Sequence, residues 1–260
     1  MKCKICTTES RLVNTLPIRN TYNAEYYLCP KCGFLFVGNP TWLTEAYKNS
    51  PINITDTGYV LRNLYLSRKT LIIFYFLFRK NHTYLDFAGG YGMLTRLMRD
   101  YGLNYYNDDA YTDNLFAKGF EYQKAQQIKA ITCFECFEHL NEPLKDIDTM
   151  FSISPNIFFS TVLFSGDKAP EDNWEYYGLN HGQHVAFYSK KTLEFLANKY
   201  QVNYYTNGSN LHMFSKIKMP NWFFRFLLWT SKVQLDLILR KILKSKTVSD
   251  HLELKKQGLI

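Results

Sequence analysis

The sequence contains no hydrophobic run that is long enough to cross a bilayer. Its most apolar stretch, "TLIIFYFLF" at residues 70–78, has only nine residues and is flanked on both sides by two basic residues. Because a membrane-spanning helix needs about 20 residues, we expect a buried helix here. The N-terminus opens on "MKCKIC" without the apolar segment of a signal peptide. Both absences predict a cytoplasmic protein.

The sequence also lacks internal repeats, low-complexity tracts and the composition of a disordered chain. Hydrophobic residues make up 46% of its 260 residues, as in globular proteins with a sizeable core. This length suffices for one medium-sized domain with a small appendage. The net charge of +8 suits an anionic partner such as a nucleotide, a polyanion or a membrane surface, although an ordinary basic protein can have the same charge.

Cysteine is scarce, but four of the six cysteines form two C-x-x-C pairs. Cys3 and Cys6 make the first pair, and Cys29 and Cys32 make the second. Four thiolates with this spacing match the tetrahedral coordination of zinc, whereas unrelated core cysteines are the alternative. We predict a structural zinc ribbon over residues 1–40, because protein ligands fill all four positions and so short a segment needs the metal to fold. No stripe of basic residues marks it for nucleic-acid binding.

A third C-x-x-C pair, Cys133 and Cys136, has no partner pair further along the chain. It follows the strand-like segment "AITCF", and buried cysteines behave as small hydrophobic residues. We therefore expect these two cysteines to be core residues.

Strand-like and helix-like segments alternate through the rest of the chain. Helices are predicted for residues 56–80, "GMLTRLMRDYG", "EPLKDIDTMFSIS" and "SKKTLEFLANKY", and strands for "HTYLDFAGG", "LNYYNDD", "IKAITCF" and "NIFFSTVLF". The alternation predicts parallel βαβ units, and "VNYYT" with "LHMFSKI" predicts a final antiparallel hairpin. The fold class is thus α/β, with a Rossmann-like, mostly parallel sheet.

The chain divides into four predicted parts. The zinc ribbon is followed by a linker with a helical lead-in at residues 41–80, an α/β domain at 81–218 and an amphipathic helical tail at 219–260. The tail contains the basic segment "MPNWFFRFLLWTSKVQLDLILRKILKSK". Such a helix docks on an anionic membrane surface, on its own domain or on a dimer partner, and the sequence leaves all three open.

The segment "LDFAGGYG" at residues 85–92 follows the first predicted strand of the domain. Ligands of such sheets bind beyond the carboxyl ends of the strands, and the small residues Ala88, Gly90 and Gly92 allow the backbone to approach a ligand closely. The spacing is not that of G-x-G-x-x-G, and no Gly-Lys-Ser/Thr follows. Loops that bind pyrophosphate or phosphate are therefore disfavoured.

Two acidic residues accompany this loop. Asp86 lies at the end of the first strand, and Asp109 ends the second strand 23 residues later. An acid at the second position is placed to accept hydrogen bonds from a ribose diol. A solvated turn acid is the alternative for Asp109.

These motifs resemble those of the class I S-adenosylmethionine-dependent methyltransferases. "YLDFAGGYG" is similar to the acidic, glycine-rich motif after their first strand, and "FECFEHLNEP" resembles the E-V-L-E-H-h-x-x-P stretch after their fourth strand. "WEYYGLNHGQHVAFYSKKTLEFLA" is similar to a segment of many bacterial members that act on sugars or metabolites. The resemblance covers residues 56–217. With its four-cysteine ribbon, the chain resembles a subgroup that acts on sugar nucleotides and other small polar substrates.

The resemblance implies S-adenosylmethionine as the cofactor and gives roles to the residues of the loop. Gly90 and Gly92 would pass under the methionine moiety, Asp86 would organise the loop, and Asp109 would hold the ribose. Ala88 stands where the family usually has glycine. Alanine is small enough for binding to survive, but a cofactor site that no longer binds is the alternative.

The resemblance also places residues outside the loop at the cofactor. Glu135, with the two residues before it, would lie beside the cofactor at the end of the fourth strand. Arg62 would pair with the cofactor carboxylate, and a surface arginine on a helix is the alternative for it.

Two histidines are candidates for removing a proton from the methyl acceptor, because histidine titrates near neutral pH. His139 follows Glu138, and His184 lies on a loop after the fifth strand, three residues after His181. We predict His184, His139 and Glu138 as catalytic residues. A structural histidine is the alternative at each position.

Glu135, Glu138 and His139 also form an E-x-x-E-H pattern. Two carboxylates and an imidazole could hold magnesium, and some methyltransferases with a similar stretch use magnesium there. Magnesium prefers oxygen ligands, which the two carboxylates provide. A role beside the cofactor and at the start of a helix, without any metal, is the alternative.

The segment "FSGDKAPEDNWEYYG" at residues 164–178 is long for a connection, and long loops often form substrate lids. Its aromatic residues Trp174, Tyr176 and Tyr177 could stack on a sugar or a base. A plain surface loop is the alternative.

Together these features predict a methyltransferase that acts on a sugar or nucleotide-sugar-type acceptor in the biosynthesis of a glycan such as a capsule or O-antigen. A nucleic-acid methyltransferase is one alternative, but no N/D-P-P-Y/F tetrapeptide follows the fourth strand. A catalytically inactive binding protein of the same fold is the other, and Ala88 is its main support.

Overall fold

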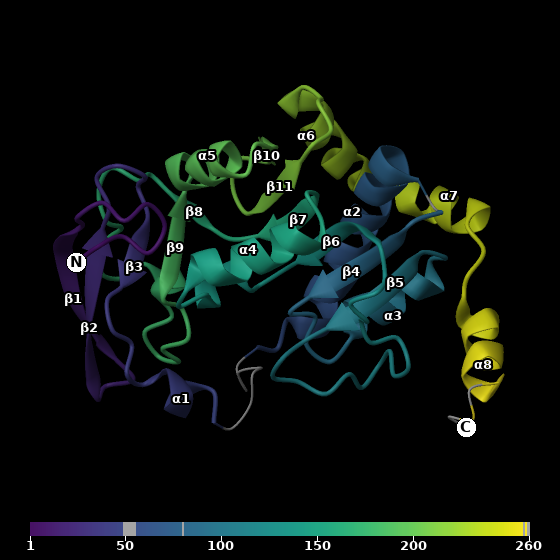
Figure 1. The fold of residues 1–260 in the computed structure, drawn as a ribbon, viewed down its shortest axis with the longest axis horizontal. Coiled ribbons are helices and arrows are strands. Elements are labelled where there is room, and N and C mark those ends of the chain that lie inside the picture. The colour runs from purple at the N-terminus through teal and green to yellow at the C-terminus, as the bar shows by residue number, and fades with distance from the viewer. Residues whose placement is uncertain (49–55, 80, 257, 259–260) are drawn as a thin grey trace. The chain divides into compact units, whose positions relative to one another are not determined.

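The computed structural model describes residues 1–48, 56–79, 81–256 and 258 (Figure 1). The predicted linker therefore lies partly outside the described residues, as do the last few positions of the predicted tail. Contacts divide the chain into two compact units. The first unit comprises the described residues of Met1–Ile54, Phe134–Ser152 and Phe159–Lys216, and the second comprises those of Thr55–Cys133, Ile153–Phe158 and Ile217–Ile260.

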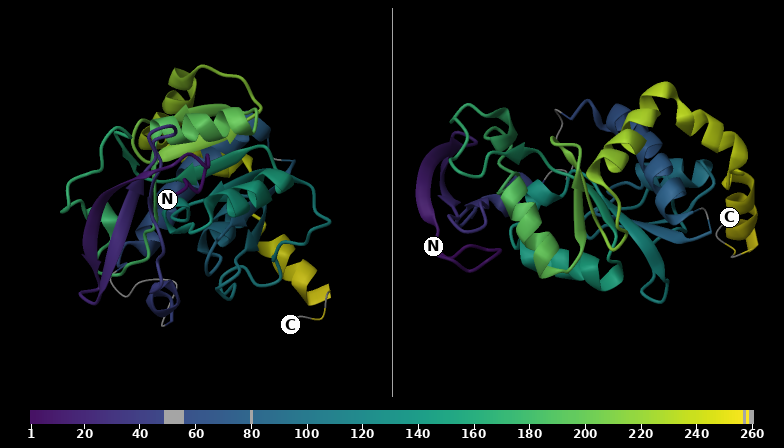
Figure 2. Two further views of the ribbon diagram at one scale, coloured as in Figure 1. Left: turned by 60° about the vertical axis from the view of Figure 1, so that its left-hand side comes forward. Right: turned by 90° about the horizontal axis from the view of Figure 1, so that it is seen from above.

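The first unit contains a sheet with the strand order β1-β2-β3-β9-β8. β1 (Arg11–Ile18) and β2 (Tyr22–Leu28) form an antiparallel hairpin, seen in purple beside the N-terminus in Figure 2. β3 (Leu35–Val37) pairs antiparallel with β2 and with β9 (Ala186–Ser189), and β8 (Leu163–Phe164) pairs parallel with β9. The cysteine-bearing segment thus shares its sheet with strands from far along the chain.

One face of this sheet builds a hydrophobic core. Alternate residues of β2 are buried, as expected for a strand with one covered face. Tyr26 is one of them, and its ring centroid lies 4.9 Å from that of Tyr177 and 6.0 Å from that of Phe187. Trp42 packs into the same core and donates its indole N–H to the carbonyl oxygen of Gly182.

Short helices and a hairpin complete the first unit. The helices are α1 (Leu43–Ala46), the 3-10 turn η1 (Phe137–His139), α4 (Pro143–Ile153), the 3-10 turn η2 (Glu175–Tyr177) and α5 (Lys190–Lys199). The predicted antiparallel hairpin is confirmed as β10 (Asn203–Thr206) and β11 (Leu211–Ser215). α5 begins at Ser189, whose side chain accepts a hydrogen bond from the amide of Thr192, because a helix start needs acceptors for its free amides.

The predicted strand "NIFFSTVLF" is wrong as a single element. It forms β7 (Ile157–Ser160) and β8, separated by Thr161 and Val162. The amide of Thr161 donates to the carbonyl oxygen of Asn210, and the amide of Val162 donates to the hydroxyl of Tyr176. These partners come from distant segments, so nothing in the local sequence marks the break.

Parallel strands form the second unit. β4 (Thr83–Phe87) pairs parallel with β5 (Asn104–Asp108) and with β6 (Ile128–Cys133), and α3 (Met93–Asp100) connects β4 to β5. α2 (Tyr59–Phe78) contacts α3, and the ring of its Phe74 packs 4.8 Å from that of Tyr84. The parallel strands and their connecting helix confirm the predicted Rossmann-like α/β class.

The C-terminal helices belong to the second unit. They are α6 (Asn221–Thr230), the 3-10 turn η3 (Ser231–Val233), α7 (Leu235–Ile242) and α8 (Thr247–Lys256), drawn in yellow-green and yellow in Figure 2. α6 and α7 contact α2, so the tail docks on its own domain, which was one of the predicted alternatives. Among the described helices, none combines the length and hydrophobicity that a membrane crossing requires.

A buried ion pair joins α8 to α3. The guanidinium of Arg99 in α3 makes two 2.7 Å hydrogen bonds to the carboxylate of Asp250 in α8 and lies 3.4 Å from the centroid of the Phe120 ring. Arg99 is 1% exposed and Asp250 is 3% exposed. The pair therefore links the last described helix to the core of the second unit.

Candidate functional site

The loop after β4 turns through left-handed backbone conformations. Ala88, Gly90 and Gly92 have φ values of +55°, +56° and +80°. Glycine adopts such values without strain, whereas a residue with a Cβ is destabilised by about 1–2 kcal/mol. This conformation explains why glycine suits position 88 better than the alanine that this chain carries.

Gly89 is the most crowded position of the loop. A Cβ at Gly89 would lie 2.2 Å from Oδ1 of Asn107 and 2.7 Å from Oδ2 of Asp86, so no side chain fits there. At Gly90, by contrast, a Cβ would approach only the hydroxyl of Tyr59, at 3.7 Å. The sequence analysis did not single out Gly89 or Asn107. The two consecutive glycines could have indicated a crowded turn, but no local pattern marks Asn107 as the residue that packs against it.

The two acids of the motif both contact this part of the fold. Asp86 is buried, and its Oδ1 accepts a 2.7 Å hydrogen bond from the hydroxyl of Thr132. Burial raises the pKa of Asp86 to about 7, although the Thr132 hydrogen bond opposes the shift. Asp109 follows the last residue of β5, and its two oxygens accept hydrogen bonds from the amides of Gly90 and Tyr111, each at 2.9 Å.

A cavity of about 550 Å³ opens beside Asp109. Its lining residues belong to β5 and the segment after it, and they include Asn107, Asp113 and Lys118. Asn107 also donates its side-chain N–H to the carbonyl oxygen of Gly90 at 3.2 Å. The fold therefore joins the glycine loop, the predicted ribose ligand and a cavity within one unit.

Arg62 lies on the first turn of α2. Its guanidinium makes two hydrogen bonds, of 2.9 and 2.7 Å, to the carboxylate of Asp56. A cofactor carboxylate would have to share or replace this ion pair.

Three histidines cluster in the first unit. η1 carries Glu138 and His139, and the segment before β9 carries His181 and His184. The two segments are joined by a 2.9 Å hydrogen bond from the amide of Val185 to the carbonyl oxygen of Glu138. The ring of His184 lies 4.9 Å from that of His139 and 4.8 Å from that of His181. The two predicted bases, 45 positions apart in the sequence, are therefore neighbours.

Their surroundings disfavour the charged form of the three histidines. Burial, with a smaller contribution from the neighbouring His184, lowers the pKa of His139 to about 3 and that of His181 to about 4. Burial also lowers the pKa of His184, although its hydrogen bond to the carbonyl oxygen of Tyr176 and the charge of Glu135 oppose the shift.

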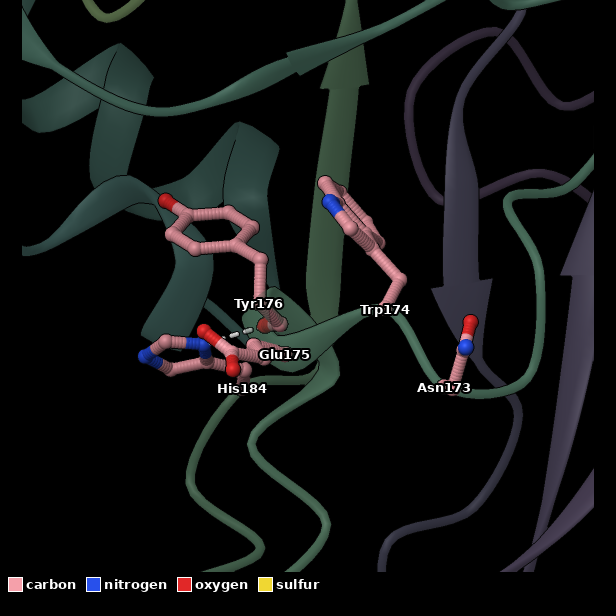
Figure 3. A pocket seen from close by; sticks show the side chains of 5 residues that line it. All are labelled: Asn173, Trp174, Glu175, Tyr176 and His184. Atoms are coloured by element: carbon pink, nitrogen blue, oxygen red, sulfur yellow. Dashed lines mark hydrogen bonds between the residues drawn. The ribbon is translucent and has the colours of Figure 1, made fainter.

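A pocket of about 600 Å³ lies against His184 (Figure 3). Asn173, Trp174, Glu175 and Tyr176 form the rest of its lining, with the rings of Trp174 and Tyr176 5.2 Å apart. Trp174 and Tyr176, two of the aromatic residues for which the sequence predicted stacking on a ligand, thus line a pocket. Asn173 and Glu175 line it as well and were not predicted.

The predicted stacking role is wrong for Tyr177. Its side chain is fully buried in the core of the first unit. Its hydroxyl donates to the carbonyl oxygen of Pro170. The short 3-10 turn η2 points neighbouring aromatic residues in different directions, so only part of the aromatic run reaches the pocket.

Glu135 is engaged by Ser160. The amide of Glu135 donates to the Ser160 hydroxyl, and that hydroxyl donates to Oε1 of Glu135, both at 2.8 Å. Among the described residues, the group with metal-ligand spacing around η1 consists of Glu138, His139 and His184, whose ligand atoms lie within 4.8 Å of one another. His184 joins this group, and Glu135 of the predicted magnesium site does not.

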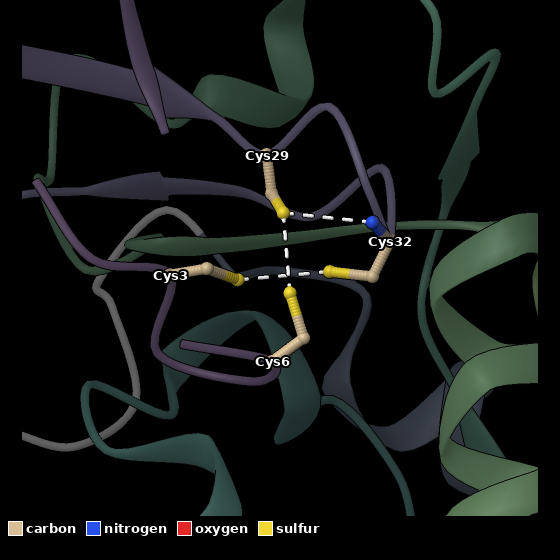
Figure 4. A group of neighbouring side chains, drawn as sticks. All are labelled: Cys3, Cys6, Cys29 and Cys32. Atoms are coloured by element: carbon tan, nitrogen blue, oxygen red, sulfur yellow. Dashed lines mark hydrogen bonds between the residues drawn. The ribbon is translucent and has the colours of Figure 1, made fainter. Parts of the chain in front are cut away.

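The four N-terminal cysteines converge in the first unit (Figure 4). Their Sγ atoms lie within 4.8 Å of one another, with 3.6 Å between Cys3 and Cys32 and 3.3 Å between Cys6 and Cys29. Zinc–sulfur bonds of about 2.3 Å in a tetrahedron place the sulfur atoms about 3.8 Å apart. The cluster is therefore compatible with zinc. The other two cysteines are buried, as predicted.

A family model described as a methyltransferase domain matches residues 61–206. The chain belongs to this family. It contains a methyltransferase domain. A comparison with curated proteins found no match.

Several solved methyltransferase structures are distantly similar to this methyltransferase. The plantazolicin methyltransferase BpumL, in complex with SAH, is 11% identical with a TM-score of 0.46, over 76% of this chain and 89% of that chain. An O-methyltransferase family protein from Burkholderia thailandensis is 11% identical with a TM-score of 0.45, over 62% and 59% of the two chains. An O-methyltransferase family 2 protein from Planctomyces limnophilus, in complex with apigenin, is 14% identical with a TM-score of 0.43. It is matched over 67% of this chain and 65% of its own length, just under two thirds.

Proposed function

We propose that this methyltransferase methylates a hydroxyl group of a sugar or nucleotide-sugar-type acceptor, in the biosynthesis of a glycan such as a capsule or O-antigen. The pocket beside His184 carries the proposal. Trp174 and Tyr176 offer aromatic surface for the apolar face of a sugar ring, and Asn173 and Glu175 offer groups that hydrogen-bond hydroxyls. A pocket with this mixture suits a small polar acceptor.

We propose S-adenosylmethionine as the methyl donor, with most of its proposed ligands in the second unit. This cofactor carries its methyl group on a positively charged sulfur. Gly90 is less crowded than Gly89, since a Cβ there would meet only the Tyr59 hydroxyl, at 3.7 Å, and we assign Gly90 and Gly92 to the methionine moiety. Asp109 is our proposed ribose ligand. Asp86, at the end of β4, is proposed to organise the loop that follows it. Ala88 belongs to the same loop.

Two further residues remain proposed cofactor contacts, each with a competing partner. Arg62 would exchange its ion pair with Asp56 for the cofactor carboxylate. Glu135 is partly held by Ser160.

Proton removal from the acceptor falls to the histidine cluster. Nδ1 of His184 donates to the carbonyl oxygen of Tyr176 (Figure 3), which leaves Nε2 with a lone pair. A neutral imidazole in the wall of the pocket is able to accept the hydroxyl proton. We assign His139 and Glu138 to positioning and polarising this group.

An acceptor assay tests the proposed function. Purified protein is supplied with methyl-labelled S-adenosylmethionine and, in separate reactions, with nucleoside-diphosphate sugars, oligosaccharides, RNA and DNA. We expect label in a sugar. We also expect Trp174→Ala to raise the KM for that sugar about 10-fold without changing cofactor affinity, while Trp222→Ala, an exposed tryptophan on α6, changes neither.

Two results would contradict the proposal. Label in RNA or DNA alone would identify a nucleic-acid methyltransferase. Calorimetry that detects no heat with S-adenosylmethionine, and none with its demethylated product, would favour the catalytically inactive binding protein, which the positive φ of Ala88 supports.

We further propose that a structural zinc ion occupies the four-cysteine cluster. The ribbon at residues 1–40, the linker at 41–80, the methyltransferase domain at 81–218 and the tail at 219–260 are the proposed organisation of the chain. Backbone amides of Ile5 and Cys32 donate to cysteine sulfur atoms, which is how proteins stabilise thiolates around a metal.

We also propose a cytoplasmic location with peripheral membrane contact through α6. Trp222, Phe226 and Trp229 follow one another at helical spacing and are exposed, with the basic residues Arg225 and Lys232 beside them. Such a face suits an anionic bilayer surface. We expect cosedimentation with phosphatidylglycerol vesicles but not with phosphatidylcholine vesicles, and loss of binding in Trp222→Ala/Trp229→Ala. Equal sedimentation with both vesicles would contradict the proposal.

A further inference from the structure

We propose that Glu138, His139 and His184 bind a divalent transition-metal ion in the first unit, next to the acceptor pocket. One ligand atom from each residue lies within 4.8 Å of the other two. Two imidazoles and one carboxylate, with further coordination positions left open, form a donor set that protein metal sites use for catalysis. The inference deepens the proposed function and rests on it for the role of the ion.

Hydrogen bonds set the imidazoles in the form that a metal requires. Nδ1 of His184 lies 2.6 Å from the carbonyl oxygen of Tyr176, and Nδ1 of His139 lies 3.2 Å from that of Gln183 and 2.9 Å from the hydroxyl of Tyr47. A carbonyl oxygen only accepts, so Nδ1 of His184 carries the proton and its Nε2 carries the lone pair. The carbonyl oxygen of Gln183 favours the same form of His139, with the Tyr47 hydroxyl as an acceptor. Metal-binding histidines are held by this kind of hydrogen bond to their other nitrogen.

His181 shows the opposite arrangement in the same cluster. Its Nδ1 accepts a 3.1 Å hydrogen bond from the amide of Gln183, so the proton of the neutral ring lies on Nε2. His181 therefore offers no free ring nitrogen as a ligand. The hydrogen bonds separate two ligands from a neighbour of identical chemistry.

Burial favours the same conclusion. Glu138 is 2% exposed, and an ionised carboxylate in such a place is stabilised by a nearby cation. His139 and His184 are only partly buried, so solvent or a ligand can reach them.

The donor set favours a first-row transition ion such as Zn²⁺, Mn²⁺ or Fe²⁺ over magnesium. Imidazole nitrogen suits these ions, whereas magnesium prefers oxygen ligands and an octahedral shell rich in water. Because His184 also lines the pocket, an ion held there would lie beside the proposed acceptor. With the ion bound, Nε2 of His184 would be a ligand and not the proton acceptor. The ion would instead lower the pKa of an acceptor hydroxyl bound to it.

Metal titration of matched variants tests the inference. The full chain is first loaded with one equivalent of Zn²⁺, enough for the four cysteines alone, and Mn²⁺ or Co²⁺ is then titrated by calorimetry. Histidine-to-asparagine variants at positions 139, 181 and 184 are compared. The asparagine amide replaces Nδ1 as donor or acceptor but cannot replace Nε2.

We expect one binding event in the parent protein. His139→Asn and His184→Asn should each weaken it by more than about 10-fold, and Glu138→Gln should weaken it as well. His181→Asn should leave it unchanged. Circular dichroism and the melting temperature of each variant establish that the fold is retained.

Two outcomes would overturn the inference. One is the absence of a second binding event in a folded, zinc-loaded parent protein. The other is equal weakening by all three asparagine variants, which would indicate a general disturbance of the cluster. The readout is independent of activity: metal binding without sugar methylation would reject the proposed function alone, and sugar methylation by a protein that binds no second metal would reject this inference alone.

Discussion

Oδ2 of Asp109 lies 2.9 Å from the backbone nitrogen of Gly90 and accepts its hydrogen bond. This hydrogen bond joins the residue after β5 to the loop after β4, so Asp109 stabilises the conformation of the glycine loop in addition to lying next to it. The second oxygen, Oδ1, accepts from the amide of Tyr111. Asp109 is thus fixed in place before any ligand arrives, which is favourable for binding because less freedom is lost.

Replacing Asp109 by alanine should weaken the binding of S-adenosylmethionine by about 1–3 kcal/mol, the scale of a lost hydrogen bond to a charged group. Calorimetric titration measures the change. Asp113→Ala is the matched control, because Asp113 lines the same cavity but is exposed, and it should bind normally. Equal affinity of the Asp109 variant and the parent would show that another group holds the ribose.

Replacing Ala88 by glycine should raise the free energy of unfolding by roughly 0.5–1 kcal/mol. The substitution removes a left-handed strain of about 1–2 kcal/mol, and the greater freedom of glycine in the unfolded chain offsets part of the gain. Urea denaturation measures it. Ala110→Gly, a nearby alanine outside the positive-φ residues, should not stabilise the protein. A loss of stability in Ala88→Gly would refute the strain at this position.

The stability of the apo protein should fall as pH rises, because of Asp86. Burial raises its pKa from the usual 3.8 to about 7, so the folded state holds a proton that the unfolded chain releases. The stabilisation from this proton is complete below about pH 4 and is lost as pH rises through about 7, with a limit of about 4 kcal/mol. Urea denaturation at several pH values compares the parent with Asp86→Asn. The difference between their free energies of unfolding should change between about pH 4 and pH 7. If the two free energies change with pH in parallel, the pKa of Asp86 is not shifted.

Replacing Cys29 by serine should remove one equivalent of zinc and lower the melting temperature, because the metal links the N-terminal segment to its own fold. Elemental analysis and calorimetry provide the two measurements. Cys133→Ser alters a buried cysteine outside the cluster and should keep the zinc content of the parent. Unchanged zinc in Cys29→Ser would exclude the four-cysteine site.

Local patterns predicted the elements whose signals are local. The alternation of "HTYLDFAGG", "GMLTRLMRDYG" and "LNYYNDD" anticipated β4, α3 and β5 because strand and helix periodicities differ within a few residues. The spacing of the four cysteines likewise anticipated their convergence. Such features need no knowledge of distant partners.

Features that depend on distant partners were not predictable. The pairing of β3 with β9 leaves no mark in either segment, and neither does the hydrogen bond from Val162 to Tyr176 that interrupts the predicted strand. Tyr176 and Tyr177 are chemically identical neighbours, yet one lines a pocket and the other fills a core. Similarly, only the fold reveals that His184, and not Glu135, completes the group around Glu138.

The ion pair between Arg99 and Asp250 also bears on the order in which the chain acquires its structure. Arg99 is buried in α3, and its carboxylate partner is synthesised some 150 residues later. An unpaired buried charge destabilises a fold by about 3–5 kcal/mol. During translation, the parallel strands of the second unit would therefore not reach their full stability until Asp250 has been synthesised and has paired with Arg99. The stability of α3 and of the parallel strands beside it thus depends on the last described helix.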